Sequence, residues 1–422
     1  RRLPLRTVEL TVQGRPDRPD RFDITAFDAT LAAGGRDAGS VQGSGNWDAG
    51  RYAFAVRLAG LQPAALDRRL PAVTLSGPLS MTGRADASVP LELRADLTGQ
   101  LPAAGSAALP AARGASTARA PARREPAGRA VQVRVDAAIS ALRIDVRDLQ
   151  ASAGAASAQL SGVARRQRDN APWQIKTLAA FRAFDPLLWF PGALQPLLGD
   201  GPHRVTGTAS ADITLPLALS SPLPSQSLLT GLLTIEGSAA MNLSDSLLAG
   251  VPLRGDLALR HPGGQPVGVQ LMLAAASNLV KADGQIDIGP SGAKDRWTID
   301  LNMPALAKLQ PLLRLLGLPD PYDHPTGAVT GQVRVDGRWP AIQTQGRLDA
   351  VGLGAAGLSL ARGDATWQLG SGPDDALQLQ ARVTEARRGT QVLERAQLQL
   401  SGSPREHRIN LQATARAVPP SW

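Results

Sequence analysis

Cysteine is absent from the chain, and this excludes disulfide scaffolds, thiol catalysis, iron–sulfur clusters and cysteine-ligated zinc. Aromatic residues are also scarce, at 4% of 422 residues, so few bulky side chains are available to fill a thick globular core. Lysine occurs only at Lys176, Lys281, Lys294 and Lys308, and arginine supplies the rest of the 45 basic residues. A general Arg- and Ala-rich composition explains this bias without any binding surface.

Long apolar runs are missing too. No stretch approaches the roughly 18 apolar residues that a membrane-spanning helix requires. Glycine (43 residues) and proline (33 residues) are abundant, and chains with so many helix breakers do not form long helices. An all-helical bundle is therefore excluded.

Motifs for catalysis, cofactor binding and metal binding are also lacking. The chain has neither a glycine-rich phosphate loop followed by lysine nor a Gly-x-Ser-x-Gly elbow. Its four histidines are scattered, and Asp374-Asp375 stands in a Gly-Pro-Asp-Asp sequence typical of a turn. We therefore expect no enzyme activity, no cofactor and no metal.

The net charge of +9 invites a nucleic-acid interpretation. Phosphate binding requires basic residues gathered on one surface, and single-strand binding adds aromatic platforms. Here arginine alternates with aspartate and glutamate, and aromatic residues are rare. We expect no nucleic-acid partner.

Alternation of apolar and polar residues is the dominant pattern. It runs through residues 91–97, 131–136, 142–147 and 377–383. A period of two places all apolar side chains of a strand on one face of a sheet and the charged ones on the other. The pattern predicts numerous one-sided strands.

A degenerate repeat of about 124 residues underlies the chain. Trp47, Trp173 and Trp297 are 126 and 124 residues apart, and Thr-Gly recurs at Thr82, Thr206 and Thr330 with intervals of 124. Between each tryptophan and Thr-Gly lies an X-Pro step with a leucine-rich stretch, which predicts short helices over 63–70, 186–198 and 304–316.

These intervals predict the domain organisation. Residues 1–46 end a preceding unit, and residues 47–172, 173–296 and 297–422 form three units, with another unit beginning at the C-terminus. Residues 102–130 consist mainly of Ala, Gly, Pro, Ser and Arg, so we expect a disordered insert there. The chain is expected to be an internal piece of a longer protein.

Two architectures satisfy this pattern. One sheet can curl along its axis so that its apolar face lines a groove suited to acyl chains, whose burial contributes about 0.8 kcal/mol per CH₂. Alternatively, a β-sandwich array or a β-solenoid encloses a dry core. Periodicity alone does not choose between them.

The tryptophan-led strand, the Phe184–Trp189 segment and the Thr-Gly-led strand resemble the TamB family, the AsmA-like inner-membrane subunits of the translocation and assembly module. The resemblance implies a mainly β fold, an elongated curled β-sheet groove (a β-taco-like repeat array) with short helices. It also implies a periplasmic protein anchored to the inner membrane, with a TamA-like outer-membrane barrel as partner through a region outside this chain.

Two functions follow from the resemblance. The first is to convey phospholipid between the inner and outer membranes, and the apolar groove favours it. The alternative is a scaffold for the assembly and secretion of outer-membrane proteins such as autotransporters. For the first, the residues expected to line the groove and contact acyl chains are Val131, Val133, Val135, Leu142, Ile144, Val146, Val333, Val335, Leu377, Leu379, Leu398 and Leu400.

Overall fold

The protein was analysed as a computed structural model. The structure describes residues 5–33, 36–67, 70–86, 89–101, 129–191, 194, 198, 201–215, 235–287, 295–315, 324–389 and 391–416. The chain divides into two compact units, Arg1–Thr206 (unit 1) and Gly207–Trp422 (unit 2), and each is described by itself.

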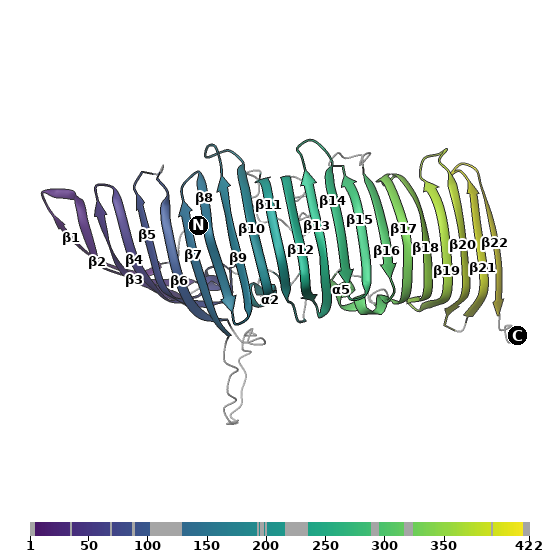
Figure 1. The fold of residues 1–422 in the computed structure, drawn as a ribbon, viewed down its shortest axis with the longest axis horizontal. Helices are drawn as coiled ribbons and strands as arrows, with labels where there is room; N and C mark the ends of the chain where they lie inside the picture. Colours follow the sequence, from purple (N-terminus) through teal and green to yellow (C-terminus); the bar gives the residue numbers. More distant parts are fainter. Residues whose placement is uncertain are drawn as a thin grey trace, which may run out of the picture. The chain divides into compact units, whose positions relative to one another are not determined.

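Unit 1 contains ten described strands: β1 (Leu5–Arg15), β2 (Arg18–Ala33), β3 (Arg36–Asp48), β4 (Arg51–Leu61), β5 (Thr74–Arg84), β6 (Leu91–Leu101), β7 (Arg129–Ile139), β8 (Arg143–Ala153), β9 (Ala156–Arg165) and β10 (Trp173–Phe184). Each strand pairs antiparallel with the next one along the chain. Figure 1 shows these strands side by side in chain order, coloured purple to blue.

Twelve described strands belong to unit 2: β11 (Val205–Leu215), β12 (Glu236–Leu248), β13 (Val251–His261), β14 (Val267–Ala275), β15 (Asn278–Ile286), β16 (Arg296–Met303), β17 (Thr326–Arg338), β18 (Ala341–Ala355), β19 (Leu358–Gly370), β20 (Leu377–Arg388), β21 (Gln391–Gly402) and β22 (His407–Arg416). They too pair antiparallel in chain order. Within the described residues no strand pairs with a distant one to close a barrel. The predicted fold class, mainly β with an open curled sheet and short helices, is confirmed.

Short helices lie where the X-Pro steps predict them, and the first, which ends at Leu66, is shorter than the predicted 63–70. Within the second predicted range, 186–198, Pro191, Leu194 and Leu198 are helical as well. The short helices are α1 (Pro63–Leu66), α2 (Pro186–Trp189), the 3₁₀ helix η3 (Leu306–Leu309) and α5 (Gln310–Leu315). Asp185 caps α2, because its Oδ1 accepts hydrogen bonds from the amides of Leu187 and Leu188. The third X-Pro step differs from the other two, since Pro311 lies inside a helical segment that has already begun at Leu306.

The helices mark a period of six strands. They follow β4, β10 and β16, and the recurring Thr-Gly pairs lie in β5, β11 and β17. Trp173 is the first residue of β10 and Trp297 the second residue of β16, whereas Trp47 lies near the end of β3 and does not occupy the equivalent strand. The 102–130 insert falls outside the described residues except for Arg129 and Ala130, which begin β7.

Asn278 fastens the third helical segment to the sheet. Its amide Nδ2 donates to the carbonyls of Ala275 (3.2 Å) and Ala305 (3.0 Å), and its Oδ1 accepts from the Ala305 amide at 3.0 Å. The side chain is fully buried. This clamp holds the start of η3 against the turn between β14 and β15.

Replacing Asn278 with alanine is expected to loosen residues 305–315 while leaving the strands folded. The change removes the acceptor of the Ala305 amide, and an unpaired buried group of this kind costs about 1–3 kcal/mol. The Ala305 carbonyl keeps its hydrogen bond from the Lys308 amide. Hydrogen–deuterium exchange should therefore accelerate in residues 305–315. Asn302→Ala, on the exposed face of β16, is the control, and equal exchange in both variants would contradict the clamp.

Candidate functional site: an apolar sheet face

Residues that pair directly across two antiparallel strands have their side chains on the same face of the sheet. In unit 2 this register builds an unbroken apolar row across all twelve strands. The row comprises Ala209, Met241, Leu257, Leu271, Ala282, Ile299, Val333, Gly346, Trp367, Leu379, Leu400 and Ile409. The sheet therefore carries one continuous apolar face through the described residues of this unit.

Unit 1 has an apolar face of the same kind. One of its rows comprises Leu10, Phe27, Gly43, Val56, Leu79, Ala95, Val135, Leu149, Leu160 and Ala179. A bulge at Arg147 in β8 shifts the parity of that strand, so Val146 and Leu149 both lie on the apolar face. The alternating pattern in the sequence does not reveal this bulge.

Eleven of the twelve predicted lining residues lie on the apolar face of their own unit. Val131, Val133 and Val135 share it with Ile144 and Val146 in unit 1. In unit 2 the register joins Leu379 to Leu400 and places Val333, Val335, Leu377 and Leu398 on the same face.

Leu142 is the exception. The strand predicted over 142–147 begins one residue later than expected. Leu142 lies in the turn before β8, which begins at Arg143, and 39% of its surface is exposed. The alternating pattern continued one residue into a turn, and a turn tip does not share the period of the strand it precedes.

Burial distinguishes an open face from a closed core. The predicted lining residues of unit 2 are all half-buried, and none is fully buried. Fully buried apolar residues in the described part of unit 2 are few: Val251, Leu253, Val267 and Ala275. A sandwich of this size would bury its facing side chains almost completely, so the middle of the face is open to solvent.

Packed helices cover only one end of the strands. In unit 1, Trp189 of α2 packs with Phe184, Val73 and Leu97, and its carbonyl accepts a hydrogen bond from the Ala72 amide at 2.8 Å. In unit 2, Leu309 and Leu312 pack against Val251, Leu253 and Ala275. Each helical segment thus reaches back over strands that precede it and buries the strand ends there.

Aromatic rings lie flat over glycines on the same face, an arrangement that sequence reasoning missed. Phe22, Trp47 and Tyr52 stack with ring centroids 6.0 Å apart at each step. A Cβ at Gly83 would meet the Tyr52 ring, and one at Gly284 would meet the Trp297 ring. Pairs of an aromatic residue and a glycine on neighbouring strands would have predicted this arrangement, but such pairs can be identified only when the strand register is known.

The opposite face is polar. In unit 2 one row of paired residues comprises Gln270, Asp283, Thr298, Arg334, Gln345, Gln368, Gln378, Ser401 and Arg408. Ion pairs also cross it, such as Arg296–Asp336 at 2.9 Å. Because water screens exposed ion pairs, each contributes at most about 1 kcal/mol.

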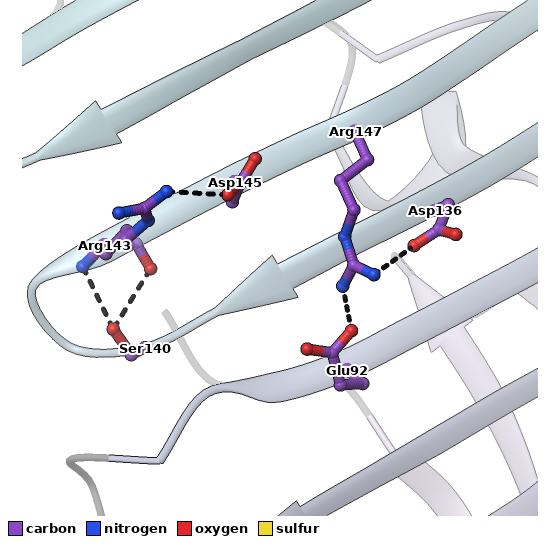
Figure 2. A network of polar contacts seen from close by, with 6 residues as sticks. All are labelled: Glu92, Asp136, Ser140, Arg143, Asp145 and Arg147. Atoms are coloured by element: carbon purple, nitrogen blue, oxygen red, sulfur yellow. Dashed lines mark hydrogen bonds and ion pairs between the residues drawn. The ribbon is translucent and has the colours of Figure 1, made fainter.

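Figure 2 shows the ion-pair network of unit 1. Arg147 contacts Glu92 of β6 and, at 3.3 Å, Asp136 of β7, while Arg143 contacts Asp145 at 2.9 Å. Every guanidinium in this network faces a carboxylate. The network therefore links neighbouring strands and leaves little uncompensated charge for an external ligand.

The described residues contain no group of three or more His, Cys, Asp or Glu side chains placed to hold a metal ion. In the same part of the chain, no helix has the length and apolar character needed to cross a membrane.

The molecule belongs to the mainly β proteins built from open antiparallel meanders with one apolar face. In comparisons with known proteins, no family model, curated protein or solved structure matches the chain.

Proposed function

We propose that this protein holds the acyl chains of phospholipids along its apolar face and conveys them between two membranes. The observation that carries the proposal is the continuous apolar face of each unit, which is half-exposed along the middle of the unit 2 strands. Such a face offers burial without hydrogen-bonding groups, and acyl chains need only burial, which contributes about 0.8 kcal/mol per CH₂.

An open face also suits transfer better than storage. No polar side chain interrupts the central row of unit 2, so an acyl chain meets no desolvated charge as it passes from strand to strand. The resemblance to the TamB family supports the same proposal. That resemblance implies a periplasmic protein anchored to the inner membrane, with a TamA-like barrel as partner, and we propose these as well.

A photoreactive amino acid at Val333 tests the proposal. Val333 is half-buried on the apolar face, and its neighbour Arg334 is exposed on the polar face. A crosslinker at Val333 is expected to capture phospholipid from vesicles, whereas one at Arg334 is not. Mass spectrometry of the adducts identifies what is captured.

Other outcomes of this experiment contradict the proposal. Equal capture at Val333 and Arg334 means surface adsorption. Crosslinks at Val333 to an unfolded outer-membrane protein, with no lipid adduct, favour the alternative of a scaffold for outer-membrane protein assembly.

A further inference from the structure

The two edges of each sheet differ in chemistry. Here an edge means one of the two rows of strand ends at which the connections lie, not an outermost strand. In an antiparallel meander, successive connections alternate between these two edges. Among the residues that the structure describes, the helical segments lie in connections from an even-numbered to an odd-numbered strand, so they share one edge of their unit. We call this the apolar edge, and the opposite one, formed by connections from odd to even strands, the charged edge.

Charged residues gather at the charged edge of unit 2. Asp295 precedes β16, Arg338 is the last residue of β17, Asp374 lies between β19 and β20, and Arg405 lies between β21 and β22. Ion pairs join neighbouring connections, with Arg338–Asp295 at 2.7 Å and Arg405–Asp374 at 3.3 Å. The hydrogen bond to Asp295 raises the pKa of Arg338, so this guanidinium stays charged.

Unit 1 repeats the arrangement. Its five odd-to-even connections contain arginine at or beside the turn, namely Arg18, Arg51, Arg84, Arg143 and Arg166. Arg166 donates to the Ala141 carbonyl at 2.8 Å, and this bond ties the β9–β10 turn to the β7–β8 turn. The same guanidinium lies 4.8 Å from the Trp173 ring centroid.

The apolar edge has turns of small and aliphatic residues. They include 153–156 in unit 1 and 247–251, 274–279 and 353–358 in unit 2, and none of these ranges contains a charged residue. Other connections at this edge do carry charged residues, namely Arg36, Asp67, Arg204, Lys308, Arg314, Arg387 and Arg388.

Burial changes from one edge to the other along single strands. At the apolar edge, Leu101 of β6 and Val131 of β7 are 0% and 4% exposed. At the charged edge, Leu91 is half-buried and Ile139 is 38% exposed. The β13–β14 turn, where His261 and Val267 are buried, is a local exception.

From this asymmetry we infer that glycerophospholipids bind parallel to the strands in one orientation, with the headgroup at the charged edge and the acyl ends at the apolar edge. The inference rests on the proposed function and adds the direction of the bound lipid. At the uncharged turns of the apolar edge a phosphate would lose its hydration among Ala, Leu and Val with no compensating partner, and such desolvation is strongly unfavourable. At the charged edge it remains hydrated, beside arginine and aspartate.

The dimensions agree with a single lipid layer. Val329 and Val335, six residues apart on the apolar face of β17, are about 20 Å apart along the strand at about 3.4 Å per residue. Half of a bilayer with its headgroups measures about 20–22 Å. A lipid whose acyl ends lie near Val329 thus places its phosphate at or just beyond Val335.

Because the chain lacks cysteine, a single introduced thiol is a unique labelling site. We would attach bimane to Val329→Cys and to Val335→Cys, both at half-buried positions of one face. Arg334→Cys, which points to the polar face, is the matched control. The probes are phosphatidylcholines with a nitroxide either on the headgroup or near the end of an acyl chain.

The headgroup nitroxide is expected to quench the label at position 335 severalfold more than the label at 329, and the acyl-end nitroxide the reverse. Neither should quench the label at 334. Equal quenching of 329 and 335 by both lipids would overturn the orientation and leave the proposed function standing. Absence of quenching at both positions, with the labelled protein folded by circular dichroism, would overturn the proposed function itself.

Discussion

Replacing Val333 with aspartate is expected to cut phospholipid capture at least tenfold and to cost only about 1 kcal/mol of folding stability. The cost to folding is small because Val333 is half-buried and the new carboxylate reaches water, so mainly β-strand propensity is lost. The loss of capture is large because a bound acyl chain would desolvate the charge in the middle of its path. Photo-crosslinking to labelled lipid and urea unfolding measure the two effects.

The control for this variant is Thr366→Asp, which places the same carboxylate on the exposed polar face opposite Arg347. It should leave both lipid capture and stability nearly unchanged. Destabilisation of Val333→Asp by several kcal/mol would mean that the face is a closed core, because an unpaired charge is that costly only when it is buried. That result would overturn both the lipid conduit and the protein scaffold.

Replacing Trp189 with alanine should destabilise unit 1 by about 3–5 kcal/mol. The ring is 4% exposed, stacks on Phe184 with centroids 5.8 Å apart, and packs into the main buried cluster of the unit. Its removal leaves a cavity where α2 covers the strand ends. Urea unfolding followed by circular dichroism measures the change.

Trp339→Ala is the matched control, since this ring is 77% exposed at the charged edge of unit 2. Surface substitutions of this kind usually stay within about 0.5 kcal/mol. Equal destabilisation of the two variants would contradict a stabilising role for α2. It would also contradict the conclusion that packing of α2 covers the strand ends at the apolar edge.

The strands and the identity of the apolar face were predictable because both depend on local period. Alternation in residues 131–136 and 377–383 assigns every apolar side chain to one face without knowledge of neighbouring strands. The X-Pro steps at 62, 185 and 310 likewise located the helices, since proline favours the first turn of a helix. The length of the first helix was overestimated, because leucines after the proline are compatible with a helix but do not require one.

Register, bulges and edge chemistry could not be obtained that way, because they depend on contacts between residues distant in sequence. The Arg147 bulge, the Tyr52 ring over Gly83 and the Arg338–Asp295 pair all join separate strands or connections. The sequence by itself determined a one-sided β chain with a repeat of about 124 residues that contains a short helix. Only the tertiary structure decided that the face stays open and that its two edges differ, because solvent exposure is set by which strands and helices pack together.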